Sequence, residues 1–279
     1  MRLRPRKAVL GLALALFGLS FCGVGCSARI SPHLPPSWSS DASSPSPAPS
    51  EEPSAPSEGA GTPSGESKEP LHSDAERPKW VFVPPEERES VLVLVNATRR
   101  LPAEYRPPDL VRPAVRAWIP EGDERGLLRR EAARALEELF RAAEERGFRP
   151  VLVSGYRSYA LQAQLYARQT GGRDEEPEVF VVAPPGASEH QTGLAVDLGQ
   201  EDGKYLLQPE FAHTALARWL SENAPRFGFV LRYPAGKEAI TRVVFEPWHY
   251  RYVGREAAEE MARTNVVLEE YLAARGEGN

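Results

Sequence analysis

Two short segments in the second half of the chain carry side chains suited to metal-dependent hydrolysis. His190 and Asp197 stand seven residues apart in a glycine-marked segment, and Glu246 and His249 stand three apart in FEPWHYRYVG. Zinc in hydrolases takes three protein ligands and leaves one position open. Two imidazoles and one carboxylate are therefore enough for one zinc ion, and a nearby glutamate can serve as its base.

Each of these spacings is weak evidence when it is taken alone. A capping aspartate and a solvated histidine would explain His190 and Asp197 equally well. Residues three apart in a flat strand face opposite sides, so Glu246 and His249 can share a cavity only where the backbone bends. Pro247 removes a donor from the strand ladder at this point and favours such a bend.

The third histidine of the folded part is not expected to bind the metal. His213 falls in an amphipathic segment that we predict to be helical, where a surface or partly packed histidine is the ordinary case. The only cysteines, Cys22 and Cys26, lie near the N-terminus, so we expect no disulfide, no cysteine nucleophile and no thiolate metal site in the folded domain.

The N-terminal third has the composition of an export signal followed by a tether. Residues 1–26 combine a basic start, an apolar run and a small-residue segment that ends at Cys26, which resembles a bacterial lipoprotein processing site. An ordinary secretory signal or an uncleaved anchor is the alternative. Residues 27–80 are rich in Ser, Pro and Glu and are predicted to be disordered. We therefore expect an extracytoplasmic protein that a lipid anchor holds at the cell membrane.

Residues 81–279 are predicted to form one α+β domain, with an antiparallel sheet flanked by helices. Helical periodicity and capping residues, including Ser158, predict helices at 127–146, 158–169, 210–221 and 255–275. Apolar runs predict strands at 91–95, 151–153, 194–198, 227–233 and 243–252. The net charge of −5 and the lack of a long basic run beyond the N-terminus argue against a nucleic-acid partner.

Several segments of this domain resemble a known family. SGYRSYALQ at 154–162, SEHQTGLAVD at 188–197, LVNATRRLPAEYRPPDL at 94–110 and the long segment 219–254 are similar to the VanY-type D-alanyl-D-alanine carboxypeptidases. These belong to the zinc D,D- and L,D-peptidases that act on cell-wall peptides. The similarity extends over roughly residues 91–254, in the family's order and with its spacing.

The resemblance implies a role for each candidate site residue. It implies one Zn²⁺ ion held by His190, Asp197 and His249, with Glu246 as the catalytic base. It also implies Arg157, Ser188 and Gln162 as substrate contacts. Arg157 could act in catalysis by stabilising the developing oxyanion, and Tyr156 could line the same cleft. Plainer roles remain open: a structural ion pair for Arg157, a turn cap for Ser188 and a core position for Tyr156.

The function expected from this resemblance is removal of the C-terminal D-Ala from peptidoglycan stem peptides by a monomeric enzyme. Two alternatives remain. The first keeps the chemistry but changes the bond, as in an L,D-carboxypeptidase or an endopeptidase. The second is a wall-binding module that has kept the fold and lost turnover.

Overall fold

A computed structural model describes residues 80–173 and 176–277 of the 279-residue chain. The predicted export signal and nearly all of the predicted tether lie outside the described residues. The account below therefore concerns the segment that carries every candidate site residue.

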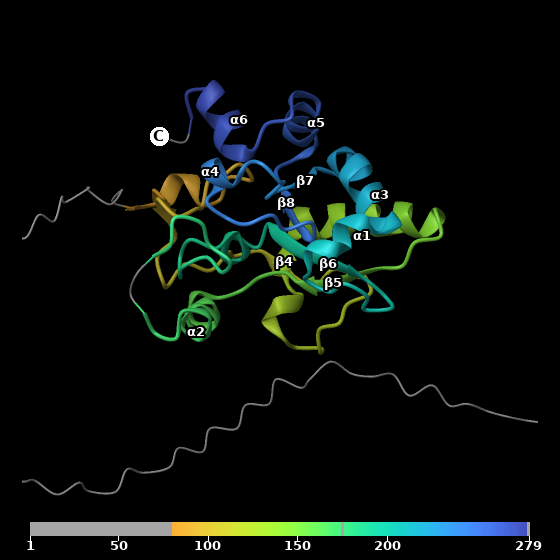
Figure 1. The fold of residues 1–279 in the computed structure, drawn as a ribbon, viewed down its shortest axis with the longest axis horizontal. Helices are drawn as coiled ribbons and strands as arrows, with labels where there is room; N and C mark the ends of the chain where they lie inside the picture. The colour runs from red at the N-terminus through yellow and green to blue at the C-terminus, as the bar shows by residue number, and fades with distance from the viewer. Residues whose placement is uncertain (1–79, 174–175, 278–279) are drawn as a thin grey trace, which may run out of the picture. The chain divides into compact units, whose positions relative to one another are not determined.

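A four-stranded antiparallel sheet lies at the centre of this segment (Figure 1). Its strands, in spatial order, are β5 (Pro150–Ser154), β6 (Ala195–Gln200), β8 (His249–Tyr252) and β7 (Phe229–Leu231). Every neighbouring pair in this sheet is antiparallel. The structure thus mixes helices with an antiparallel sheet, as the sequence predicts.

Two shorter sheets of two strands each accompany the central one. β1 (Val81–Phe82) pairs in parallel with β2 (Arg99–Arg100), and β3 (Leu110–Val111) pairs antiparallel with β4 (Leu128–Arg129). The strand predicted at 91–95 is wrong, because this segment is turn and irregular backbone. Val93, Leu94 and Val95 are nevertheless buried, so the apolar run indicates burial here rather than sheet pairing.

Helices surround the central sheet. The α-helices are α1 (Arg130–Glu145), α2 (Tyr159–Thr170), α3 (Ala215–Asn223), α4 (Glu238–Thr241), α5 (Arg255–Thr264) and α6 (Leu268–Ala274). Short 3₁₀ helices are η1 (Pro85–Glu87), η2 (Glu124–Gly126), η3 (Glu189–Thr192), η4 (Pro209–His213) and η5 (Ala224–Phe227). The predicted cap of α2 is confirmed, because the Ser158 side chain accepts a hydrogen bond from the Leu161 amide.

Three predicted elements are shorter or divided. The helix predicted at 210–221 is divided at Thr214, whose side chain accepts from the Ala217 amide and so begins α3. The helix predicted at 255–275 is divided at Asn265, which takes a left-handed φ of 55°. The strand predicted at 243–252 begins only at His249, because the backbone turns at Pro247 and Trp248.

The alternation of side chains along β6 and β8 separates a core face from a polar face. Val196 and Leu198 belong to the main apolar cluster, together with Tyr250 of β8 and with residues of α1 and α3. Successive strand residues face opposite sides of a sheet, so Asp197 and His249 lie on the other face. The apolar core on the α1 side therefore holds rigidly the strands that carry two of the candidate metal ligands.

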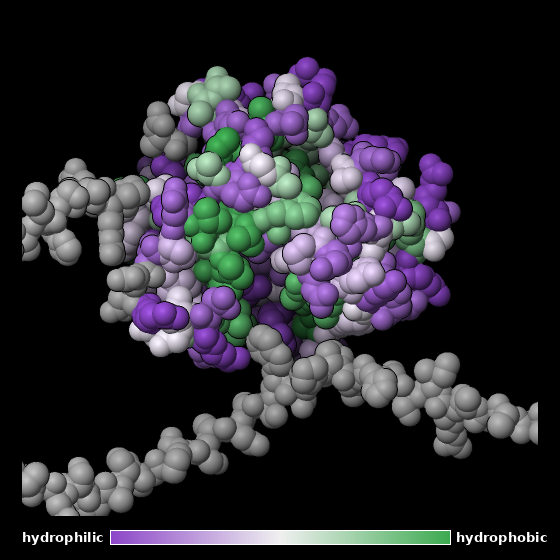
Figure 2. All heavy atoms as spheres, viewed as in Figure 1, coloured by the Kyte–Doolittle hydropathy of each residue, from purple (hydrophilic) through white to green (hydrophobic). Residues whose placement is uncertain are grey.

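The face of this segment that Figure 2 shows is mostly polar. In the view of Figure 2, hydrophilic residues cover most of the outline, and apolar residues gather near the centre. Among the described residues, none of the helices has the length and apolar content that crossing a bilayer requires.

Candidate metal centre

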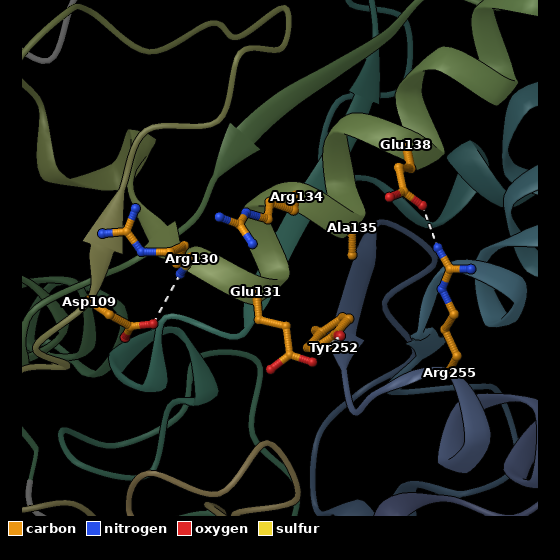
Figure 3. A pocket seen from close by; sticks show the side chains of 8 residues that line it. All are labelled: Asp109, Arg130, Glu131, Arg134, Ala135, Glu138, Tyr252 and Arg255. Carbon is orange, nitrogen blue, oxygen red and sulfur yellow. Dashed lines mark hydrogen bonds and ion pairs between the residues drawn. The ribbon is translucent and has the colours of Figure 1, made fainter.

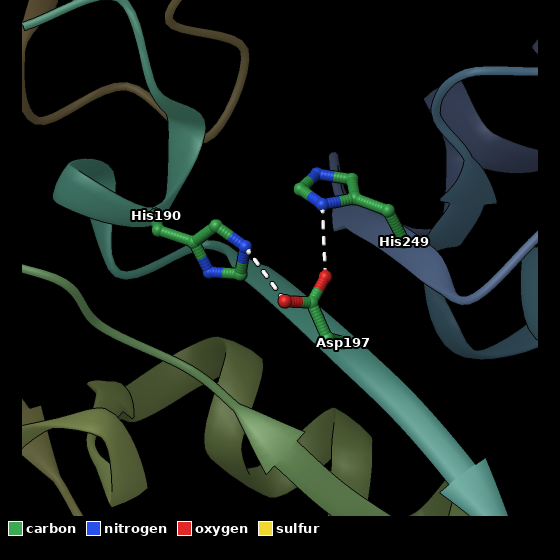
Figure 4. A group of neighbouring side chains, drawn as sticks. All are labelled: His190, Asp197 and His249. Atoms are coloured by element: carbon green, nitrogen blue, oxygen red, sulfur yellow. Dashed lines mark hydrogen bonds and ion pairs between the residues drawn. The ribbon is translucent and has the colours of Figure 1, made fainter. Parts of the chain in front are cut away.

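Asp197 and His249 are brought together by the register of two neighbouring strands. They are directly paired residues of β6 and β8, on the face of the sheet away from α1. Oδ1 of Asp197 lies 3.1 Å from Nδ1 of His249 (Figure 4). Opposed side chains of an antiparallel pair lie within direct contact distance, so the backbone alone is enough to create this half of the site.

His190 completes the group from η3, the 3₁₀ turn just before β6. Its Nε2 lies 3.2 Å from Oδ2 of Asp197, while its Nδ1 donates a 2.6 Å hydrogen bond to the carbonyl oxygen of Gly155. Because a carbonyl can only accept, the proton of a neutral His190 ring sits on Nδ1. The lone pair of Nε2 is therefore directed at the place where a metal would lie.

The donor set fits a zinc ion. One ligand atom from each of His190, Asp197 and His249 lies within 4.8 Å of the others, and all three residues are buried. Two imidazole nitrogens and one carboxylate oxygen are ligands that zinc favours in catalytic sites, where the fourth position stays open. His213, by contrast, is exposed at the end of η4 and is not part of the group.

Glu246 reaches the same place through the turn at Pro247. The His249 amide donates to the Glu246 carbonyl at 3.1 Å, which closes the turn, and the Glu246 amide donates to the Tyr233 carbonyl. Oε2 of Glu246 then lies 3.7 Å from Nδ1 of His249. The bend predicted at Pro247 is thus present, and it brings the two side chains together.

The site holds two carboxylates in different ionisation states. Burial raises the pKa of Glu246 to about 7, and the negative charge of Asp197 adds to this rise. Burial would also raise the pKa of Asp197, but His190 and His249 outweigh it and hold that pKa well below its usual range. Asp197 is therefore a permanent anion, whereas Glu246 can take up and release a proton near neutral pH.

The two histidines are also set apart by their surroundings. Burial lowers the pKa of His190, which favours the neutral ring that a metal needs. Burial opposes the charge on His249 as well, but the nearby carboxylates of Asp197 and Glu189 outweigh it and raise the pKa of His249 to about 9. In the metal-free protein His249 is therefore an imidazolium between carboxylates, and a metal ion would displace the Nδ1 proton.

A bulge in β5 directs Arg157 toward the metal group. Leu152 pairs with Leu198, but the next pair joins Ser154 to Asp197, so one extra residue is accommodated at this point. Arg157 follows, with Nη2 3.6 Å from Oδ2 of Asp197. Its guanidinium also donates to the Gln162 side chain at 2.8 Å and to the Ser154 hydroxyl at 3.2 Å.

The other predicted substrate contacts occupy different settings. Gln162 is buried, with its oxygen on Arg157 and its amide nitrogen on the Ala183 carbonyl at 2.6 Å. Ser188 is buried next to η3, and its side chain does not cap that turn. Tyr156 is buried in the core, with the Arg106 guanidinium 4.9 Å above its ring.

Sequence analysis did not single out a buried charged group behind the metal ligands. Glu189, Arg232 and Arg251 have almost no exposed surface, and both arginines form ion pairs with Glu189. One signal was present in the sequence: Arg251 stands two residues after His249, so in a strand both side chains lie on the same face. The ion pairs with Glu189 join residues that lie far apart in the chain, so no local sequence pattern predicts them.

Two surface pockets are lined by residues other than those of the metal group. One, of about 410 Å³, lies along α1 and is lined by charged residues and Tyr252, with a Glu138–Arg255 ion pair at its rim (Figure 3). The other, of about 450 Å³, is lined by Trp80, Phe82, Arg100 and Tyr159 among others. His190, Asp197, Glu246 and His249 line neither pocket.

Comparison with known proteins identifies the family. The family model for VanY D-alanyl-D-alanine carboxypeptidases matches residues 125–255. A D-alanyl-D-alanine carboxypeptidase of Enterococcus faecalis is 38% identical over 196 residues, which cover 67% of this chain and 67% of that protein. The chain belongs to the VanY family. The matched range contains every candidate site residue, from Tyr156 to His249.

Solved structures of VanY-family and related peptidases show the same fold. The LdcB LD-carboxypeptidase is 40% identical, with a TM-score of 0.65 over 70% of this chain and 90% of that one. A VanY D,D-pentapeptidase from a VanB-type resistance cassette, solved in complex with Zn(II), is 35% identical. Its TM-score is 0.52, over 65% of this chain and 98% of that one.

Proposed function

We propose that this protein is a zinc carboxypeptidase that removes the C-terminal D-Ala from peptidoglycan stem peptides. The observation that carries the proposal is the convergence of His190, Asp197 and His249, with the Glu246 carboxylate 3.7 Å from His249. Family membership and the Zn(II) complex of a VanY relative support both the metal and the substrate class.

Zinc, when bound, supplies a Lewis acid that polarises the scissile carbonyl and lowers the pKa of an attacking water. In this proposal Glu246 takes the proton from the attacking water and passes it to the leaving amine. Its pKa of about 7 suits a group that must both accept and donate a proton near neutral pH. The buried setting keeps bulk water from competing with this transfer.

Arg157 is proposed to bind the substrate beside the metal. Its side chain is 15% exposed, and Gln162 and Ser154 fix its orientation by hydrogen bonds. A guanidinium held in this way presents its remaining donors in a fixed fork. It is suited to stabilise the negative charge that develops on the scissile carbonyl oxygen, or the terminal carboxylate of the peptide. Gln162 then acts by holding Arg157, and Ser188 and Tyr156 are proposed as further substrate contacts.

An L,D-carboxypeptidase is the second candidate, and a specific observation favours it. The LdcB LD-carboxypeptidase aligns with a TM-score of 0.65, against 0.52 for the VanY D,D-pentapeptidase. Both reactions release a terminal D-Ala and use the same four central side chains. They differ in the residue that precedes the scissile bond.

Mass spectrometry of stem peptides tests the proposal and separates the candidates. The full chain is incubated with a pentapeptide that ends in D-Ala-D-Ala and, separately, with a tetrapeptide that ends in a single D-Ala. Loss of one alanine from the pentapeptide alone supports the D,D-activity, and loss from the tetrapeptide alone supports the L,D-activity. Zinc binding without release of alanine from either would favour a wall-binding module and contradict the proposed function.

We also propose that the protein acts outside the cytoplasm, anchored through Cys26. The basis is the composition of residues 1–26 and the location of the proposed substrate in the cell wall. Metabolic labelling with a fatty-acid analogue tests this proposal. The wild type should be labelled and Cys26→Ala should not, whereas equal labelling of both would contradict it.

A further inference from the structure

Glu189 places a fully buried carboxylate behind one of the metal ligands. Its exposed fraction is 0%, although it directly precedes His190 in η3, next to the site. Oε2 of Glu189 lies 3.6 Å from Nε2 of His249, the ring nitrogen that does not face Asp197. Within the described part of the chain, neither of these two atoms has a hydrogen-bond partner. Each is therefore the natural partner of the other.

Two buried arginines hold this carboxylate in place through its other oxygen. Oε1 of Glu189 accepts from Nε of Arg232 at 2.9 Å and from Nη1 of Arg251 at 2.7 Å. Two charged donors on Oε1 keep the group ionised and stop it from rotating. Oε2 is consequently a fixed acceptor that faces His249.

The arginines are themselves anchored to distant parts of the fold. Arg251 donates through Nη2 to the carbonyls of Val91 and Val93, at 3.0 and 2.8 Å. Arg232 donates to both carboxylate oxygens of Glu269 on α6, at 2.9 and 2.7 Å. Packing and hydrogen bonds thus fix the position of Oε2 from several sides.

We infer that Glu189 is a positioning residue that selects which nitrogen of His249 takes the metal. The inference rests on the proposed zinc site. By accepting a hydrogen bond from Nε2–H, Glu189 keeps the proton of the neutral ring on Nε2. The lone pair of Nδ1 then faces Asp197, on the side where His190 Nε2 also lies. A carboxylate behind a ligating histidine also raises the basicity of that ligand.

Glu189→Gln is a sharp test because it keeps the shape and changes only the pattern of donors. An amide has one oxygen and one NH₂ group. If the oxygen faces the two arginines, the NH₂ group meets Nε2–H of His249. If the NH₂ group faces the arginines, it meets their N–H donors instead. The two arginine donors favour the orientation with the oxygen on their side. The NH₂ group then faces Nε2–H of His249, donor against donor, so zinc ligation through Nδ1 is penalised.

The experiment measures zinc affinity by competition with a chromophoric chelator. Glu189→Gln should bind zinc roughly tenfold to a hundredfold more weakly than the wild type. Glu269→Gln is the matched control, because it weakens the same buried network at Arg232 without facing His249. It should lower thermal stability and leave zinc affinity unchanged. Equal zinc affinity of Glu189→Gln and the wild type would overturn the inference.

Nuclear magnetic resonance of the zinc-loaded wild type gives an independent readout, even if Glu189→Gln fails to fold. Two-bond ¹H–¹⁵N correlations should assign Nε2 of His249 as protonated and Nδ1 as metal-bound. A metal-bound Nε2 would overturn the inference while leaving the zinc site intact. A wild type that binds no zinc would contradict the proposed function itself, so the two failures are distinguishable.

Discussion

Asp197 and His249 face each other across β6 and β8, with a carboxylate oxygen and a ring nitrogen 3.1 Å apart. The strand register alone determines this contact. A slip of one residue would place Tyr250 opposite Asp197 and would turn the metal ligand toward the α1 core. The apolar residues on the opposite face, such as Val196 and Tyr250, therefore protect the site geometry by fixing the register.

Loss of a ligand should remove both the metal and the activity. In His249→Ala and Asp197→Ala, only two of the three protein ligands remain, so zinc content measured by elemental analysis should fall sharply and D-Ala release should cease. His213→Ala is the control, because this histidine is exposed and lies outside the metal group. Stoichiometric zinc in His249→Ala would show that the ligand set is wrong.

Loss of the proposed base should separate metal binding from catalysis. Glu246→Gln keeps the size of the side chain but cannot accept a proton from water. We expect one zinc per chain and a kcat that falls by about 10²- to 10⁴-fold. Zinc content and kcat are measured on the same preparation. Wild-type turnover in this variant would rule out Glu246 as the base.

Arg157→Lys should weaken catalysis without releasing the metal. A lysine keeps the charge, but it lacks the planar fork that bonds Gln162 and Ser154 together. We expect kcat/KM to fall by about 10²- to 10³-fold, with zinc content unchanged. If the residue serves only as a structural ion pair to Asp197, kcat/KM will stay near the wild-type value after correction for any loss of stability.

A side chain at Gly155 should disturb the metal site, because the Gly155 carbonyl accepts the hydrogen bond that orients His190. A Cβ at this position would lie 2.5 Å from the Leu127 carbonyl oxygen, closer than real Cβ atoms come to backbone. Gly155→Ala should therefore shift the backbone and weaken zinc binding through His190. Gly199→Ala on β6 is the control, since its Cβ would meet only side-chain methyl groups, at 3.2 Å or more, and no backbone atom. Equal zinc affinity in both variants would contradict this explanation.

The metal-free protein should lose stability as the pH rises above neutral. The pKa of His249 is raised from 6.5 to about 9 in the folded state, so its contribution is fully present below pH 6.5 and disappears as the pH rises through 9. Glu246, raised from 4.5 to about 7, acts in the same direction at lower pH. Thermal unfolding of chelator-treated protein at pH 5, 7 and 9 measures this trend.

Zinc should reverse that dependence, because the ion competes with the proton on Nδ1 of His249. Zinc affinity is therefore expected to increase with pH over the range in which the metal-free protein becomes less stable. A metal-free protein whose unfolding temperature rises from pH 6.5 to 9 would contradict the proposed charge state of His249.

Local sequence patterns predicted the helices that depend on neighbours in sequence. They failed where the structure depends on contacts between residues far apart in the chain. Helix periodicity located α1, and Ser158 located the start of α2, because both depend on neighbours in sequence. The segment at 91–95 was mispredicted because the carbonyls of Val91 and Val93 bond to the buried Arg251 rather than to a strand. An apolar run cannot reveal a partner that lies about 160 residues away in the chain.

The candidate site shows the same division between local and tertiary information. The turn at Pro247 could be expected from its missing donor, and it does bring Glu246 to His249. The bulge in β5 that directs Arg157, and the role of Gln162 in holding it, depend on contacts with β6 and with the Ala183 carbonyl. Family resemblance marked these residues without giving the physical reason for them.

The most direct test of the account is the dependence of D-Ala release on zinc. The full chain is stripped of metal, and alanine released from a stem peptide is measured by mass spectrometry as zinc is added back. Activity should be lost on chelation and should rise linearly to a plateau at one zinc per chain. Hydrolysis that continues at the full rate in the metal-free protein would contradict the account.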